Sequence, residues 1–261
     1  MPTATKQRAE LVLCRLGAYR PARNAYQSVF NRDAYAERQR DRAFYRSFLQ
    51  PGDLAFDVGA NEGRLTETFA ALGARVVAVE PNPDLAERIR DRYGSSDVAV
   101  EAVAIGAQAG TATLRLGRDS EHSTLSTDWE AALRAEGGDD RWAGTIEVPV
   151  TSLDLLIERH GAPDFIKIDV EGFEPEVLSG LHRASPALSF EFQCRAIALA
   201  VHSVQLVAAL GDYEFSFAGP DRAALPADGW MGATELLETL DVARRRDPKG
   251  YGDVYARLPR R

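Results

Sequence analysis

Glycines and carboxylates near residue 60 are spaced as they are where a strand leads into a nucleotide-binding turn. The segment 57–63, DVGANEG, follows a short apolar run and precedes an amphipathic stretch. Gly59 and Gly63 let backbone N–H groups approach a ligand closely, and the following helix directs its positive end at that ligand. Glu80 lies 23 residues beyond Asp57, where an acid accepts hydrogen bonds from a ribose diol. The spacing predicts a nucleoside-binding site.

The charge beside the turn indicates which nucleoside is bound. The turn reads GxNxG rather than GxGxxG, and Asp57 stands directly before it. A carboxylate in this place disfavours a pyrophosphate but favours a ligand that carries an ammonium and a sulfonium. We therefore expect S-adenosylmethionine as the cofactor. An NAD-dependent oxidoreductase is the alternative, supported only by the strand–helix–strand unit and Glu80.

The bulk composition is that of an ordinary globular protein. The chain has 261 residues, of which 45% are hydrophobic and 27% charged, enough for one substantial core. Its net charge of −8 argues against a nucleic-acid partner. It has no apolar run of the roughly 20 residues that span a bilayer and no signal-peptide pattern, so we expect a cytoplasmic protein. Cys14 and Cys194 stand in unrelated contexts and predict neither a disulfide nor a cysteine metal site.

The first 49 residues differ in charge from the rest. They carry ten Lys and Arg against four acids, a net charge of +6. Helices are predicted over 7–20 and 33–49, and the aromatic residues 44, 45 and 48 of the second share one face, which indicates packing rather than substrate stacking. We divide the chain into a helical extension, 1–50, that helps to form the acceptor site, and a main domain, 51–261.

Strands and helices alternate through the main domain, which predicts a mostly parallel sheet covered on both faces. The expected strands are 54–58, 75–79, 98–103, 165–168, 187–192, 213–217 and 253–258. The expected helices are 62–72, 83–93, 151–160, 175–181 and 197–210. Two stretches whose residues alternate as in half-buried strands, 111–116 and 145–150, interrupt the alternation of strands and helices. Between them lies a polar insert with His122 and a short helix, for which Thr127 and Glu130 form a capping box.

Ligands of such sheets bind beyond the carboxyl ends of the strands, where the strand order reverses. That rule brings together residues that follow five different strands. Residues predicted to bind the cofactor are Asp57, Gly59, Ala60, Asn61, Gly63, Glu80, Pro81, Val103, Ala104 and Asp169. Glu171 and Glu191 are expected at the same edge.

Four motifs in this order resemble those of the FkbM-type class I methyltransferases over about residues 50–260. They are DVGANEG at 57–63, VEPNP at 79–83, TSLD at 151–154 and FIKIDVEGFE at 165–174. The resemblance implies a Rossmann-like, doubly wound seven-stranded sheet with an antiparallel last strand. It also implies S-adenosylmethionine as methyl donor, bound at Asp57, Gly59, Asn61, Gly63 and Glu80, and O-methylation of a sugar, a glycoconjugate or a natural product.

Methyl transfer to oxygen requires alignment of the reacting atoms and removal of the hydroxyl proton. The candidate general bases are Asp169, Glu171, Glu191 and His122. Alternatively, the three acids could hold a divalent cation such as Mg²⁺, because hard oxygen ligands suit that ion. The expected partner is a small-molecule or glycosyl acceptor, and a homo-oligomer is left open. A cofactor-binding scaffold without catalysis, which recognises an anionic partner through the basic arm, is the remaining alternative.

Overall fold

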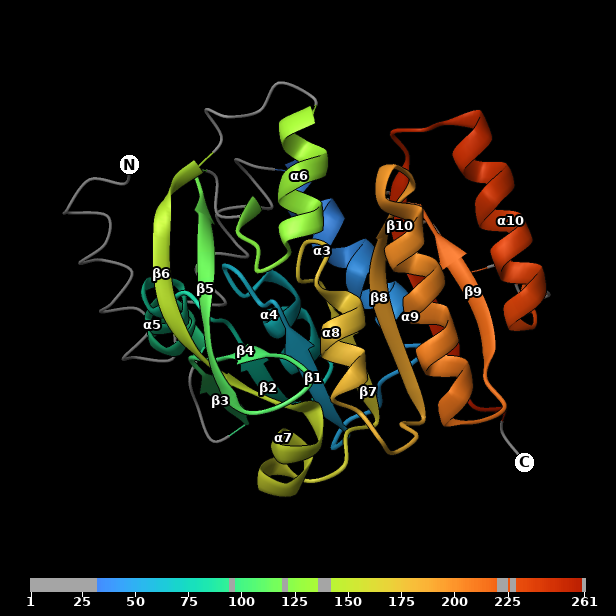
Figure 1. Cartoon of the computed structure of the whole chain (residues 1–261). Helices are drawn as coiled ribbons and strands as arrows, with labels where there is room; N and C mark the ends of the chain where they lie inside the picture. Colours follow the sequence, from blue (N-terminus) through green and yellow to red (C-terminus); the bar gives the residue numbers. More distant parts are fainter. Residues whose placement is uncertain are drawn as a thin grey trace.

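A seven-stranded sheet runs through the middle of the molecule, with helices against both faces (Figure 1). The computed structural model of the chain describes residues 32–93, 97–118, 122–135, 142–219, 225 and 229–259. The strands of the sheet are β1 (Leu54–Val58), β2 (Arg75–Val79), β3 (Val98–Glu101), β7 (Phe165–Ile168), β8 (Ala187–Gln193), β9 (Glu214–Ala218) and β10 (Tyr251–Arg257). Their order in space is β3-β2-β1-β7-β8-β10-β9.

The strand order reverses between β1 and β7. From β1 the chain runs outward through β2 to β3, and it returns at β7 to the other side of β1, with all these pairings parallel. β10 lies between β8 and β9 and runs antiparallel to both. The predicted doubly wound sheet with an antiparallel last strand is confirmed. Its switch point, where such sheets bind ligands, lies between β1 and β7.

Each face of the sheet has its own apolar core, because alternate residues of a strand point to opposite faces. Phe56 and Ile166 belong to one core, whereas Ala55 and Phe165 belong to the other. The first core is covered by α7 (Leu153–His160), α8 (Glu174–Ser179), α9 (Ile197–Leu210) and α10 (Ala233–Arg246). The second is covered by α3 (Arg32–Tyr45), α4 (Arg64–Ala71) and α5 (Pro83–Tyr93). No helix in the described part of the chain is long and apolar enough to cross a membrane.

A second, three-stranded sheet stands beside the main one (Figure 1). Its strands are β4 (Ala104–Ile105), β5 (Gly110–Gly117) and β6 (Trp142–Thr151), in the order β4-β6-β5. The predicted pair is confirmed as β5 and β6. The strand predicted over 98–103 is wrong at its end, because β3 stops at Glu101 and the chain leaves the main sheet so that β4 can pair with β6.

Helix ends also differ from the sequence-based predictions. The helix predicted over 62–72 begins at Arg64, because Gly63 takes a left-handed φ of 79°. α6 (Thr127–Ala135) lies where a short helix is predicted, but Ser126 caps it and accepts a hydrogen bond from Trp129 N at 3.1 Å. The sequence does not predict α10. The predicted helix 7–20 and Cys14 lie outside the described residues.

Aromatic packing attaches α3 to the sheet, as its sequence predicts. Tyr45 is fully buried, and its ring centroid lies 4.9 Å from that of Phe69. Phe48 follows the helix and stacks on Tyr255 of β10 at 5.4 Å. The described part of the N-terminal segment therefore shares a core with the main domain.

Replacing Tyr45 with Ala should lower the free energy of unfolding by about 3–5 kcal/mol, because a large buried ring is lost and a cavity is left. Urea unfolding followed by circular dichroism measures this change. Val242→Ala on the exposed side of α10, where the side chain is 47% exposed, should change the value by less than about 0.5 kcal/mol. Equal effects of the two substitutions would mean that α3 is not part of the core.

Candidate active site

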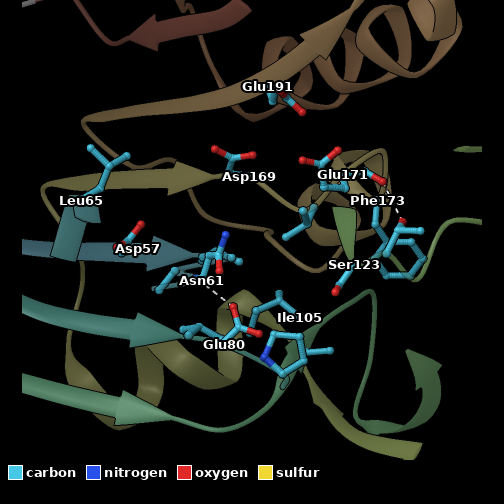
Figure 2. A pocket seen from close by; sticks show the side chains of 18 of the residues that line it. Asp57, Asn61, Leu65, Glu80, Ile105, Ser123, Asp169, Glu171, Phe173 and Glu191 are labelled. Carbon is cyan, nitrogen blue, oxygen red and sulfur yellow. Dashed lines mark hydrogen bonds between the residues drawn. The ribbon is translucent and has the colours of Figure 1, made fainter. Parts of the chain in front are cut away.

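A cavity of ≈ 520 Å³ opens beyond the carboxyl ends of β1, β2, β7 and β8. Residues from the turn after β1, the loop after β2, the start of β4 and the loop after β7 line it. Figure 2 shows Asp169, Glu171 and Glu191 on one side of the cavity and Glu80 with Ile105 on the other. The predicted site residues that line it are Asp57, Gly59, Ala60, Asn61, Glu80, Pro81, Val103, Ala104, Asp169, Glu171 and Glu191. Gly63 and His122 are not among the lining residues.

The turn after β1 has a backbone that other residue types would not permit. Gly59, Asn61 and Gly63 have positive φ angles of 82°, 50° and 79°. A Cβ on Gly59 would lie 1.7 Å from the backbone oxygen of Asp169, so this glycine allows the two loops to meet. A Cβ on Gly63 would lie 2.8 Å from the Tyr93 ring, which gives that glycine a packing role instead.

Glu80 is held at the cavity by two backbone hydrogen bonds. Its side chain is 5% exposed, and its two carboxylate oxygens accept hydrogen bonds from the backbone N–H groups of Asn61 and Asn82, both at 2.8 Å. Burial raises the pKa of Glu80 from its usual 4.5 to about 7, against the lowering effect of the two N–H donors. The first of these hydrogen bonds is drawn in Figure 2.

Asp57 is the last residue but one of β1, and its side chain is buried. Thr66 Oγ1 of α4 donates a hydrogen bond to Asp57 Oδ2 at 2.5 Å. Burial raises the pKa of Asp57, while this hydrogen bond and the positive charge of Lys167 oppose the shift. A nearby cation would therefore stabilise the ionised form of Asp57.

The loop after β7 is tied down on two sides. Glu174 Oε1 accepts hydrogen bonds from the backbone N–H groups of Val170 and Gly172, both at 3.2 Å. Thr124, in the insert, donates a hydrogen bond to the backbone oxygen of Glu171 at 2.7 Å. Glu171 has a left-handed φ of 53°, which is uncommon for a residue other than glycine and occurs at functional sites. These contacts fix the backbone of the loop that bears Glu171 at the cavity.

Carboxylates of Asp169, Glu171 and Glu191 gather at one side of the cavity, with one oxygen of each within 4.8 Å of the others. Burial and the negative charges of Asp169, Glu171 and Glu174 raise the pKa of Glu191 well above its usual 4.5. Three acids this close favour a proton or another positive charge among them. The structure thus brings together the three predicted catalytic carboxylates but leaves His122 outside the cavity lining.

A fully buried lysine lies beneath this cluster. Lys167 Nζ is 2.8 Å from Asp253 Oδ1 of β10 and 3.2 Å from Asp169 Oδ2. On β8, the residue paired with Lys167 is the small Ser189. One positive charge is thereby shared by Asp253 of β10 and by Asp169, which directly follows β7, and the ion pair holds the Asp169 carboxylate in place.

Several residues of the site escape prediction from the sequence. Arg64 lines the cavity, Thr66 binds Asp57, Thr124 binds the loop after β7, and Glu174 holds the same loop from within. Only Glu174 belongs to a motif that the sequence makes visible. The other three lie on segments whose approach to the cavity depends on tertiary packing.

Comparison with known families agrees with this geometry. A sequence model of the methyltransferase FkbM domain matches residues 57–207, more than half of the chain. The chain belongs to the FkbM methyltransferase family. It is 32% identical, over 142 residues, to hexuronic acid methyltransferase AglP of Haloferax volcanii, and the match covers 53% of this chain and 54% of AglP. The chain therefore spans about half the length of this curated relative.

Solved methyltransferases resemble the structure loosely. An O-methyltransferase from Bacillus cereus in complex with SAH has a TM-score of 0.42 and 12% identity, covering 96% of this chain and 91% of its own. Precorrin-6y C5,15-methyltransferase from Geobacter metallireducens GS-15 has a TM-score of 0.42 and 15% identity, covering 85% of this chain and 88% of its own. These likenesses carry no argument about substrate.

The cofactor of methyltransferases, S-adenosylmethionine, fits the residues present. The cavity volume of ≈ 520 Å³ lies within the range of about 300–1,000 Å³ that ligand pockets occupy. Asp57 and Glu80 offer carboxylates to the ammonium and to the ribose hydroxyls. Asn61 Oδ1 is buried and lacks a hydrogen-bond partner among the described residues, as expected of a group that a ligand completes.

Gly59→Ala should weaken binding of S-adenosylhomocysteine at least tenfold and lower the free energy of unfolding by more than about 1 kcal/mol, because Cβ would displace the loop that bears Asp169. Calorimetry and urea unfolding measure the two effects. Gly110→Ala is the matched control, since a Cβ there meets nothing within 4 Å. Unchanged binding by the Gly59 variant would show that the two loops need not meet.

The ligand-free protein should lose stability as pH rises from about 4.5 to 7. Between these values the folded state keeps a proton on Glu80 that the unfolded state has released, so deprotonation favours unfolding. The shift of Glu80 corresponds to about 3 kcal/mol. In urea unfolding at several pH values, Glu80→Gln should flatten the decline, whereas Glu87→Gln on the exposed side of α5 should leave it unchanged. A decline of the same slope in both variants would contradict this role of Glu80.

Proposed function

We propose that the protein is an S-adenosylmethionine-dependent O-methyltransferase that acts on a hydroxyl of a sugar, a glycoconjugate or a natural product. Family membership and the fit of the cavity support the cofactor. The observation that supports transfer to oxygen is the carboxylate cluster, because an alcohol must lose its proton as it accepts the methyl group. The name of AglP makes sugars the first acceptors to test.

The three carboxylates suit different tasks. Asp169 is held by its ion pair with buried Lys167 at 3.2 Å, which suits it to orienting the acceptor hydroxyl. Burial and the neighbouring acids raise the pKa of Glu191, which makes its carboxylate a stronger base than an ordinary glutamate. We assign proton removal to Glu191 and acceptor positioning to Asp169 and Glu171. The bound cofactor supplies an electrophilic methyl group on sulfonium.

The charge of the residues that line the cavity indicates which acceptors should bind best. Among the described residues, the cavity is lined by eight carboxylates and one guanidinium, that of Arg64. This excess of negative charge disfavours an anionic acceptor by Coulomb repulsion. A neutral hexoside should therefore be a better acceptor than the matching hexuronide.

Glu191→Gln should lower kcat by about 10²- to 10⁴-fold, the contribution typical of a general base, and leave the affinity for S-adenosylhomocysteine unchanged. The assay follows methyl transfer to a panel of glycosides and their uronic acid counterparts. Glu158→Gln, an exposed acid on α7, is the control and should retain full activity. Undiminished turnover by the Glu191 variant would exclude it as the base.

The same purified protein can be used to test the three remaining alternatives: a metal site, a non-catalytic scaffold and an oxidoreductase. If chelation abolishes turnover and Mg²⁺ restores it, the three acids act as metal ligands instead of as base and positioning groups. If S-adenosylhomocysteine binds but no acceptor is methylated, the non-catalytic scaffold gains support. The match to the methyltransferase FkbM domain argues against an NAD-dependent oxidoreductase, and only binding of NAD would support that alternative again.

A further inference from the structure

The amino-acid end of S-adenosylmethionine carries a carboxylate as well as an ammonium. The acids that line the cavity serve the ammonium and the sulfonium, but they would repel the carboxylate. Among the described lining residues, only Arg64 has a permanently positive side chain. Charge complementarity therefore makes Arg64 the candidate partner of that carboxylate.

Arg64 stands in the right place for this contact. It is the first residue of α4 and directly follows the turn that lines the cavity. Burial raises the pKa of Asp57, and the charge of Arg64 is among the weaker effects that oppose this rise; both side chains line the same cavity. Asp57 is the expected partner of the cofactor ammonium. Ammonium and carboxylate are bonded to the same carbon atom, so a ligand that reaches Asp57 brings its carboxylate towards Arg64.

The guanidinium is already oriented by α3. Arg64 Nη1 forms an ion pair with the buried carboxylate of Asp41 and lies 3.6 Å from Glu37 Oε1. Within the described residues, these contacts use Nη1 alone. The edge formed by Nε and Nη2 can still take a carboxylate through two parallel hydrogen bonds.

We propose that Arg64 binds the α-carboxylate of S-adenosylmethionine and that Asp41 positions its guanidinium. The proposal rests on the proposed function, because it assumes that this cofactor occupies the cavity. It gives the N-terminal segment a part in cofactor affinity as well as in the acceptor site. The competing explanation is that Arg64 only attaches α3 to α4, as Arg38 does through its ion pair with Glu67 at 3.3 Å.

Calorimetry with two ligands tests the proposal. The first is S-adenosylhomocysteine, and the second is 5′-deoxy-5′-(3-aminopropylthio)adenosine, which lacks only the carboxylate. Arg64→Met should weaken binding of the first about ten- to hundredfold, as expected for lost charge-assisted hydrogen bonds, and change binding of the second less than about twofold. Arg64→Lys should weaken binding of S-adenosylhomocysteine less than Arg64→Met does, because lysine keeps the positive charge but cannot donate two parallel hydrogen bonds to a carboxylate.

Controls separate this role from a structural one. Arg38→Met removes the other ion pair between α3 and α4, and it should leave the preference for the carboxylate-bearing ligand unchanged. Asp41→Asn alone should reduce the preference for S-adenosylhomocysteine over the ligand without a carboxylate. When Asp41→Asn is added to Arg64→Met, that preference should fall no further. An equal loss of affinity for both ligands in Arg64→Met and in Arg64→Lys would overturn the proposal. A wild-type protein that binds neither ligand would instead overturn the proposed function, and this inference with it.

Discussion

The site depends on the close approach of two loops at the switch point of the sheet. The turn after β1 passes so near to the loop after β7 that a single Cβ on Gly59 would collide with the backbone of Asp169. Parallel pairing of β1 with β7 brings the ends of both strands to the same edge. The glycine-rich turn and the acidic loop therefore belong to one rigid arrangement, which gives the proposed cofactor and acceptor sites fixed relative positions.

The arrangement concentrates negative charge at a cost in stability. Glu80 and Glu174 each have a pKa of about 7, and burial is the largest cause in both. Glu80 lines the cavity, so a ligand that brings positive charge and hydrogen-bond donors stabilises its ionised form, and binding is coupled to stability through this side chain. The positive charge of buried Lys167 offsets part of this negative charge through its ion pairs with Asp169 and Asp253.

Local patterns in the sequence predict most of the sheet and much of the site. The glycine-rich turn, Glu80 and the motif at 165–174 follow apolar strands, and the switch-point rule brings them together at the edge where the cavity lies. Contacts that depend on tertiary packing cannot be predicted from such local patterns. Arg64 directly follows the predicted turn, but its guanidinium is oriented by Asp41 of α3, and Thr124 reaches the site because the insert folds over the loop after β7. β3 ends early because pairing of β4 with β6 prevails over the local strand pattern.

We propose that this acidic cavity holds S-adenosylmethionine with Glu80 on the ribose. Titration calorimetry with S-adenosylhomocysteine at pH 6 and pH 8 tests it most directly. Because Glu80 has a pKa of about 7 before binding and its ionised form accepts hydrogen bonds from the ribose hydroxyls more strongly, binding should be micromolar at pH 8 and several-fold weaker at pH 6. Absence of binding at both pH values, or identical affinities at the two, would contradict the account.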